Sequence, residues 1–499
     1  MRRIVLVSAS VALAVGLLFF GSYAGTTDDM NKAQAQTVTT AAAQPNIVFI
    51  VTDDMRKDDM KYMPKTQSLI REQGMGFRNA FVSNALCCPA RATIMRGQYS
   101  HNNGVWSNSS TDSTSTTSGG WQAYQDNDNE ADNVATRLDA AGYRTGLFGK
   151  YMNGYANTAF QPRGWDRWFA TFSDGDPHYF NYDVNDQGTI RHFGTNDSDY
   201  KTDVISTHTN AFISNSAEAG TPFFAYVAPI APHEPATPAP RHVHAYDGEK
   251  APRLSSFNEV DVSDKPSWIR QLPRLTSEQI AAVDDRHEKR VESLQAVDDL
   301  VAGVINTLNR TTPDGANPLD NTYIFFTSDN GFFHGEHRIP RQKWRPYEED
   351  IQVPLVVRGP GVAAGSTTYR LTLNTDYLST FADLAGAQIP SYVDGRSLVP
   401  VLHESVTSWR NAILLEAAAN YSPAYRGIRT VNTSTIARRK YVEYSGGARE
   451  LYNLESDDFE LANRYEAAAP PEALAARLQE LKSCGANAAV TCRAAEDGL

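Results

Sequence analysis

The sequence predicts an α/β protein built on parallel strands that are buried on both faces. Two observations predict the strands: residues 47–51 and 323–326 are continuous apolar runs, without the polar alternation of a half-exposed strand. A third observation is the alternation of strand and helix patterns between these runs. Hydrophobic residues make up 41% of the 499 residues and aromatic residues 10%, which is typical of a globular chain with a sizeable core.

The elements follow in order along the chain. Further strands are expected at 145–148 and 223–227, and helices at 134–141 and 279–308. Residues 108–120 are dense in Ser, Thr and Gly and predict a surface excursion, while the prolines of residues 229–240 predict a shaped, non-helical loop. From about residue 405 the pattern changes to short strands, such as 440–444, and then to an alanine-rich helix over 471–482. We therefore assign residues 45–404 to one domain and residues 405–499 to a smaller C-terminal α+β subdomain.

The N-terminal residues have the pattern of a secretory signal. Arg2 and Arg3 precede an apolar run over residues 4–20, and small residues suited to cleavage follow it. We interpret residues 1–35 as signal peptide and leader, and residues 36–44 as a linker. An uncleaved anchor stays open, because the 17 apolar residues 4–20 are at the lower limit for a bilayer span. The expected location is secreted or cell-envelope (periplasmic), with no stable membrane span after processing.

Charge and cysteine usage narrow the function. The formal net charge of −12 argues against general nucleic-acid binding, which usually shows as a basic excess. Cys484 and Cys492 lie close together, and in an exported protein we expect them to form a disulfide. Cys87 and Cys88 are then left without disulfide partners, which suits a chemical role better than a structural disulfide.

The pentad Cys87-Cys88-Pro89-Ala90-Arg91 puts a thiol near a cation in what we predict to be a rigid turn. Adjacent cysteines do not bridge each other without strain, and the pentad lacks the paired CxxC spacing of a zinc site. A nearby cation lowers a thiol pKa, so a thiol nucleophile is one interpretation. A buried cysteine pair in an ordinary turn is another.

Polar residues with oxygen ligands follow both apolar runs. Asp53 and Asp54 come after the first run, and Asp329 and Asn330 after the second. Because sites in open parallel sheets lie beyond the carboxyl ends of the strands, both pairs are expected to face one crevice. Three carboxylates and one amide carbonyl suit calcium or magnesium. Each pair alone is more typical of a turn or a helix cap, but together with the pentad they predict a metal site.

These motifs, from Pro45-Asn46 to Arg358-Gly359-Pro360, resemble those of the type I sulfatases. The resemblance implies an alkaline-phosphatase-like/sulfatase fold, with a large mixed, mainly parallel central sheet flanked by helices, and hydrolysis of a sulfate ester. It implies that a formylglycine-generating enzyme oxidises Cys87 to formylglycine, and that a divalent cation is bound, Ca²⁺ in preference to Mg²⁺. The metal ligands that match are Asp53, Asp54, Cys87, Asp329 and Asn330. The catalytic residues that match are Cys87, Arg91, Lys150, His233 and Lys343.

In the implied reaction, hydrated formylglycine attacks sulfur and His233 donates a proton to the leaving alcohol. The basic residues and the cation stabilise the developing negative charge. Many sulfatases carry a histidine two residues after the lysine that Lys150 matches, where it helps to discharge the sulfated intermediate. This chain has Met152 there, which cannot act as a base. His101 and His337 are the candidate replacements.

Several segments look most like the N-acetylglucosamine-6-sulfatases, which implies 6-sulfated N-acetylglucosamine as substrate. The segments are residues 86–89, 149–153, 179–182 and 321–325. Residues 335–338 look more like broader bacterial sulfatases and arylsulfatases, so an arylsulfatase of broad specificity, acting on aryl sulfates, is the first alternative. A metal-dependent phosphodiesterase or phosphonate hydrolase is the second. An enzyme that uses the unmodified thiol and a non-catalytic binder of sulfated glycans complete the candidates.

Overall fold

A computed structural model describes residues 44–109, 119–156, 158–173, 178–310, 315, 317–419, 422–431, 437–465 and 471–498. The predicted signal peptide and leader, nearly all of the linker and most of the excursion at 108–120 lie outside the described residues, so these assignments stay predictions. Within the described part of the chain, no helix is long and apolar enough to cross a bilayer.

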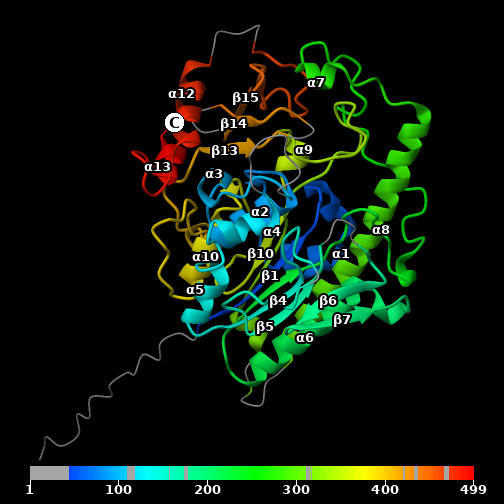
Figure 1. Ribbon diagram of the computed structural model, residues 1–499, viewed down its shortest axis with the longest axis vertical. Helices are drawn as coiled ribbons and strands as arrows, with labels where there is room; N and C mark the ends of the chain where they lie inside the picture. The colour runs from blue at the N-terminus through cyan, green and yellow to red at the C-terminus, as the bar shows by residue number, and fades with distance from the viewer. Residues whose placement is uncertain are drawn as a thin grey trace, which may run out of the picture. The chain divides into compact units, whose positions relative to one another are not determined.

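The central sheet has ten strands in the order β11-β2-β10-β9-β1-β8-β4-β5-β6-β7 (Figure 1). The strands are β1 Asn46–Thr52, β2 Met75–Phe77, β4 Arg144–Lys150, β5 Arg167–Thr171, β6 Tyr182–Asp186, β7 Thr189–Phe193, β8 Phe223–Ala228, β9 Thr322–Ser328, β10 Leu355–Arg358 and β11 Ser366–Thr368. β1 runs parallel to both of its neighbours, β8 and β9. β10 is antiparallel to β9, and β6 is antiparallel to both β5 and β7. The mixed, mainly parallel sheet is therefore confirmed, and the four predicted strands correspond to β1, β4, β8 and β9.

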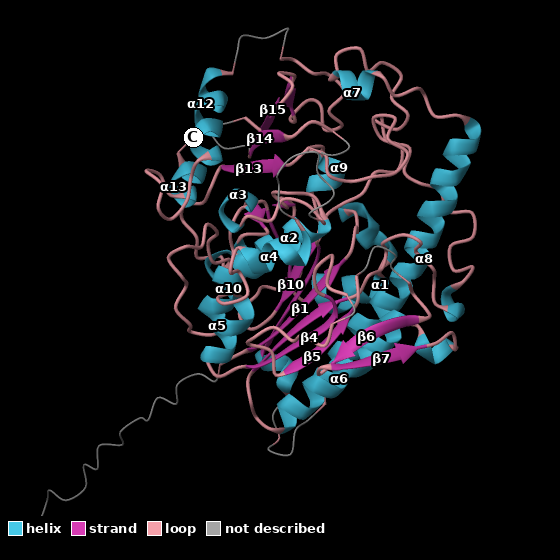
Figure 2. Ribbon diagram, viewed as in Figure 1, coloured by secondary structure: helices cyan, strands magenta, loops and turns pink. Residues whose placement is uncertain are grey.

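Helices cover both faces of this sheet (Figure 2). The α-helices of the described residues, over both sheets, are α1 Pro64–Thr66, α2 Cys87–Arg96, α3 Ser100–Asn103, α4 Gly120–Asp126, α5 Val134–Ala140, α6 Lys201–Glu218, α7 Ser267–Arg270, α8 Ser277–Leu308, α9 Glu348–Ile351, α10 Asp376–Leu384, α11 Val399–Leu402, α12 Glu472–Lys482 and α13 Cys492–Asp497. The predicted helices correspond to α5, α8 and α12. α8 begins at a capping box, in which the Thr276 hydroxyl accepts from the Gln279 N–H and the Gln279 side chain accepts from the Thr276 N–H.

The apolar run of β1 is continuous because each face of the strand meets a different set of helices. Ile47, Phe49 and Val51 pack in the hydrophobic cluster that includes side chains of α2, α5 and α10. Val48 and Ile50 point the opposite way, into the cluster formed with α6 and α8. Burial on both faces holds the C-terminal end of β1, and the polar residues after it, at a fixed place.

A second, four-stranded antiparallel sheet follows, in the order β13-β14-β15-β16. Its strands are β13 Ala412–Ala417, β14 Tyr425–Thr430, β15 Arg439–Tyr444 and β16 Arg449–Asn453, and a further pair of short strands is β3 Ala80–Phe81 with β12 Thr372–Leu373. The predicted disulfide between Cys484 and Cys492 is confirmed. Residues Gln44–Leu499 form one compact unit, and the domain boundary after residue 404 stays a prediction.

One local prediction was wrong: the cysteine pentad is not a turn. Cys87 is the first residue of α2, and Pro89 lies in the first helical turn. The N–H groups of a first turn have no partner within the helix, so the missing N–H of a proline there removes no helical hydrogen bond. The Ala90 N–H already donates to the Leu86 carbonyl at 2.9 Å. The helix ends at Gly97, whose φ of 64° is the left-handed conformation of a glycine C-cap.

Candidate active site

Cys87 lies at the N-terminus of α2, where it meets acidic and basic side chains. Its sulfur lies 3.3 Å from Asp53 Oδ1, 3.8 Å from Asp54 Oδ1 and 2.6 Å from Lys343 Nζ. The side chain is fully buried. Burial, together with the charge of Asp53, raises the pKa of the Cys87 thiol although Lys150 opposes this effect. Burial thus opposes formation of the thiolate, which is the form in which a cysteine acts as a nucleophile.

The two predicted pairs of oxygen ligands, Asp53 with Asp54 and Asp329 with Asn330, meet at one edge of the sheet. β1 and β9 pair in parallel with Thr52 opposite Ser328, so the residues that follow each strand are brought together. The Asp54 N–H donates to Asp329 Oδ1 at 3.0 Å, and Asn330 Nδ2 donates to Asp54 Oδ1 at 2.7 Å. These side chains and that of Asp53 are all buried.

Three basic residues contact the three carboxylates. Arg91 Nε donates to Asp329 Oδ2 at 2.9 Å, and Arg91 Nη2 lies 2.8 Å from the same oxygen. Lys150 Nζ donates to Asp53 Oδ2 at 2.6 Å, and Lys343 Nζ donates to Asp54. Arg91 Nη1 also donates to the Lys150 carbonyl at 3.0 Å, so the arginine of α2 and the end of β4 are tied together.

These contacts shift the pKa values of Asp53 and Asp329 in opposite directions. Burial opposes ionisation of Asp53, but Lys150 and His233 overcome it and hold the pKa of Asp53 well below its usual range. Burial and the nearby Asp53 raise the pKa of Asp329 to about 6, despite its ion pair with Arg91. A bound cation would favour ionisation of both carboxyl groups.

His233 is held with one ring nitrogen toward the site. Its Nδ1 lies 2.7 Å from the Glu234 carbonyl, which only accepts, so Nδ1 carries the proton. Nε2 lies 3.7 Å from Asp54 Oδ2. The Tyr179 hydroxyl donates to the His233 carbonyl at 2.7 Å and fixes the loop. Burial lowers the pKa of His233, while Asp54 opposes this shift.

The residues present fit a divalent cation. Asp53, Asp54, Cys87 and His233 offer ligand atoms that all lie within 4.8 Å of one another. Asn330 Oδ1 is buried and has no hydrogen-bond partner among the described residues. A buried amide oxygen without a partner is costly unless something else satisfies it. Three carboxylates and an unpartnered carbonyl oxygen form the oxygen-rich set that calcium or magnesium requires.

A cavity of about 240 Å³ opens onto the site. It is lined by Asp54, Leu86, Asn108, His233, Glu234, Phe332, Arg341, Gln342, Lys343 and Trp344. Most of these side chains are polar, and two are aromatic. The cavity therefore offers hydrogen-bonding groups and apolar faces to a small polar molecule next to residue 87.

The C-terminal sheet anchors the segment that carries Lys343. The Tyr347 hydroxyl donates to Glu450 of β16 at 2.7 Å, and Arg429 of β14 pairs with Glu348 at 3.1 Å. Sequence analysis missed this anchoring, because the partners are 103 and 81 residues apart in the chain and neither pair matches a local motif.

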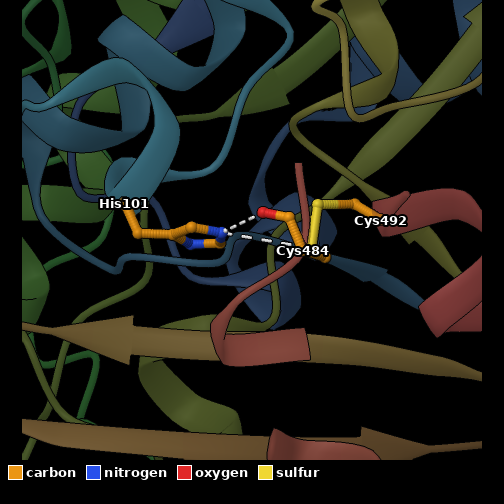
Figure 3. Close-up of side chains that lie close together, drawn as sticks. All are labelled: His101, Cys484 and Cys492. Carbon is orange, nitrogen blue, oxygen red and sulfur yellow. Dashed lines mark hydrogen bonds between the residues drawn. A yellow bond between two sulfur atoms is a disulfide. The ribbon is translucent and has the colours of Figure 1, made fainter. Parts of the chain in front are cut away.

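The two histidines proposed to replace the missing base are bound elsewhere. Figure 3 shows His101 beside the Cys484–Cys492 disulfide, where Nε2 lies 3.0 Å from the Cys484 carbonyl oxygen. The other ring nitrogen, Nδ1, lies 3.1 Å from Glu416. His337 is buried, and its Nδ1 lies 2.7 Å from Glu259. Met152 packs in the hydrophobic cluster of α2 and α5. Among the described residues that line the cavity, His233 is the one histidine.

Arg290 of α8 is a second residue that sequence analysis missed. It is buried and donates to the carbonyl oxygens of Asp54 and Pro232, the latter at 2.9 Å. It therefore joins the loop after β1 to the loop that carries His233. A basic residue in a long charged helix ordinarily lies on a solvated face, so the sequence holds no signal for this role.

Known proteins resemble this chain over most of its length. The family model described as Sulfatase matches residues 45–387, and the model described as N-sulphoglucosamine sulphohydrolase, C-terminal, matches residues 335–484. The N-acetylglucosamine-6-sulfatase of Homo sapiens is 34% identical over 91% of this chain and 87% of its own length.

Solved structures agree with the family match. A structure described as being in complex with its substrate D-glucosamine-2-N,6-O-disulfate has a TM-score of 0.72 and 26% identity, over 88% of this chain and 97% of the other. The phosphonate monoester hydrolase of Agrobacterium radiobacter has a TM-score of 0.63 and 21% identity, over 88% of this chain and 95% of its own chain. The second likeness shows a shared fold alone.

Proposed function

The chain belongs to the sulfatase family, and we propose that it hydrolyses the 6-sulfate ester of N-acetylglucosamine, with residue 87 as the nucleophile. The observation that carries this proposal is the place of Cys87 at a helix N-terminus, in contact with Asp53, Asp54 and Lys343. Two similar proteins support the substrate, since one is named an N-acetylglucosamine-6-sulfatase and the other is described with a 6-O-sulfated glucosamine.

Residue 87 needs activation, because burial raises the pKa of its thiol. Matured by a formylglycine-generating enzyme, it would supply a hydroxyl nucleophile, and a divalent cation would polarise the ester and the nucleophile. Asp53, Asp54, Asp329 and Asn330 would hold the cation. We expect Ca²⁺ in preference to Mg²⁺, since calcium tolerates a crowded, irregular set of oxygen ligands.

The charges of the site favour a singly charged ester. Arg91, Lys150 and Lys343 balance the three carboxylates that they contact. A divalent cation would therefore leave the site with a net positive charge, and the N-terminus of α2 adds a positive potential. Lys343, 2.6 Å from the Cys87 sulfur, is placed to stabilise negative charge on the sulfonyl oxygens as the ester bond breaks.

His233 would move protons in both steps. When the ring is protonated at Nε2 as well as at Nδ1, a charged form that Asp54 beside Nε2 favours, Nε2 would donate its proton to the leaving sugar oxygen in the cavity that His233 lines. The ring is then neutral, and Nε2 is free to accept the proton of the remaining hydroxyl of residue 87 when sulfate leaves. This single-imidazole arrangement follows from Met152, which packs in the hydrophobic core and leaves no second histidine in the described cavity lining.

A comparison of substrates tests the proposal. We expect the highest kcat/KM for N-acetylglucosamine 6-sulfate, with lower values for glucosamine N-sulfate, a 2-sulfated sugar and an aryl sulfate. Turnover of the aryl sulfate alone would support the arylsulfatase alternative. Faster hydrolysis of a matched phosphate diester or phosphonate monoester would support the phosphodiesterase alternative. Tight binding of sulfated sugars without sulfate release would support the non-catalytic binder.

A further inference from the structure

A second groove lies near the catalytic cavity and shares none of its lining residues. It consists of cavities of about 680 Å³ and 270 Å³, which have Lys57 and Arg78 in common. Lys57 begins the short helix η1 (Lys57–Tyr62), three residues after Asp54. Arg78 directly follows β2. The groove is therefore built from segments that leave the central sheet.

The groove and the active site lie at the same edge of the sheet. β2 is antiparallel to β10, β10 is antiparallel to β9, and β9 is parallel to β1, so β2 and β1 point the same way. Three strand spacings separate them, which amounts to about 14 Å. A ligand of several linked units, but not a single small molecule, reaches from one to the other.

The groove lining includes cationic side chains that form no ion pair with any described residue. Among the described residues, Lys57, Lys61 and Arg78 form no ion pair, although the protein as a whole is acidic. Lys57 Nζ donates to the Arg78 carbonyl at 3.3 Å. Burial lowers the pKa of Lys57. The carboxylates of Asp58 and Glu348 oppose this shift, and the like charge of Arg78 adds to it. An anion in the groove would relieve that repulsion.

Two of the four acidic side chains of the groove lining, Glu348 and Asp458, form ion pairs. Glu348 pairs with Arg429 at 3.1 Å, and Asp458 pairs with Arg438. Asp58 and Glu455 are the remaining carboxylates of the lining. The cations that can bind a ligand thus lie together around Lys57 and Arg78.

An exposed aromatic ring completes the groove. Tyr369 lines the larger cavity with 69% of its surface exposed, and its carbonyl accepts from Asn79 Nδ2 at 2.7 Å. A single exposed aromatic residue is common on protein surfaces. Here the ring lines the same cavity as the two cations and the amides of Asn79 and Gln352. Sugar rings pack on aromatic faces, amides bind hydroxyl groups, and arginine and lysine bind sulfate.

We propose that the groove defined by Lys57, Arg78 and Tyr369 binds sulfated sugar units of a longer glycan chain while another unit of that chain occupies the catalytic cavity. The inference rests on the proposed function for its substrate class. Binding in the groove makes the enzyme prefer oligosaccharides to monosaccharides of the same sulfation, because only the longer chain occupies both the groove and the catalytic cavity.

Binding of a size-defined heparin hexasaccharide to the full-length Cys87→Ala protein tests the groove. We expect the double variant Lys57→Ala, Arg78→Ala in this background to bind the hexasaccharide at least about tenfold more weakly. Tyr369→Ala weakens binding, whereas Tyr369→Phe keeps the ring and the affinity. A control, Arg270→Ala with Arg274→Ala, removes two exposed positive charges outside the groove and leaves affinity within about twofold.

Equal hexasaccharide affinity in the double variant and the parent, or equal losses in the double variant and the control, would overturn the proposal. Measurements of sulfate release distinguish a failure of the groove proposal from a failure of the proposed function. With Cys87 intact, the double variant is expected to keep its rate on N-acetylglucosamine 6-sulfate and to lose kcat/KM on a 6-sulfated hexasaccharide. If the wild-type protein released no sulfate but still needed Lys57 and Arg78 for binding, the proposed function would fail and the groove would stand.

Discussion

The ammonium of Lys343 lies 2.6 Å from the sulfur of Cys87, although the two residues are 256 positions apart in the chain. The same ammonium donates to Asp54. One lysine therefore contacts both the proposed nucleophile and a proposed ligand of the cation, and the C-terminal sheet holds it there through Tyr347 and Glu348. The smaller sheet thus has a part in building the active site.

Replacing Lys343 should slow the chemical step. Lys343→Ala removes the positive charge beside the nucleophile, and we expect kcat to fall about 100-fold or more, as for the loss of a preorganised charge-stabilising group. Lys343→Arg keeps the charge and should retain more activity. Steady-state kinetics on the sulfated sugar check this. A raised KM with unchanged kcat would show that Lys343 only binds substrate.

Replacing Arg91 should destabilise the fold. Its guanidinium is fully buried and pairs with Asp329, so Arg91→Ala leaves a buried carboxylate without its partner. We expect a loss of about 3–5 kcal/mol in the free energy of unfolding, measured by urea titration. Arg253→Ala is the control, because the Arg253–Asp284 pair is partly exposed and should contribute at most about 1 kcal/mol. Equal losses in the two variants would contradict the proposed importance of the buried pair.

Calcium should stabilise the protein through the ligands beside Cys87. After chelation, addition of Ca²⁺ at about 100 times its dissociation constant should add about 2.7 kcal/mol of stability, seen as a rise in Tm. Asn330→Leu removes the unpartnered carbonyl oxygen and should weaken this response. A second acidic cluster, Asp247, Glu288 and Glu292, provides the control, since Glu288→Gln should leave the response unchanged. A response lost in Glu288→Gln and kept in Asn330→Leu would place the cation elsewhere.

His101 should make the attachment of the C-terminal segment depend on pH. Its Nδ1 faces Glu416 and its Nε2 faces the Cys484 carbonyl, so both nitrogens donate only when the ring is protonated. Burial lowers the pKa of His101, but Glu416, the Cys484 carbonyl and Asp394 outweigh this and raise it. A raised folded-state pKa gives stability that is complete below the unfolded pKa of about 6.5 and is lost as pH rises through the folded value.

The test compares wild type with His101→Gln from about pH 5 to pH 9. We expect wild type to be more stable by about 1.5–3 kcal/mol at the acidic end, and the difference to narrow as pH rises. A difference that is constant over this range would show that the ring acts by packing and not by its charge.

The central part of the site could be predicted from sequence because its parts follow buried strands. The apolar runs of β1 and β9 mark their own C-terminal ends, and parallel pairing then brings Asp53 and Asp54 to Asp329 and Asn330. Strand pattern and residue type are therefore enough to predict which oxygen ligands come together. The roles of the individual residues stay predictions until variants are measured.

Other features left no local pattern in the sequence. α6 is rich in Thr, Ser and Asn, which have weak helix propensity, so packing on the sheet and not local preference makes it a helix. The start of α2 reads as a turn because Cys87, Cys88 and Pro89 are poor helix formers, yet proline is acceptable in a first turn. The groove at Lys57 and Arg78 arises from strand order in the sheet, which no local motif encodes.

The rate of sulfate release from N-acetylglucosamine 6-sulfate, compared between wild type and Cys87→Ala, tests the central claim most directly. Both proteins are produced with a formylglycine-generating enzyme and supplied with Ca²⁺. We predict steady release of inorganic sulfate by wild type and no release above background by Cys87→Ala. Release at the wild-type rate by Cys87→Ala would show that residue 87 is not the nucleophile.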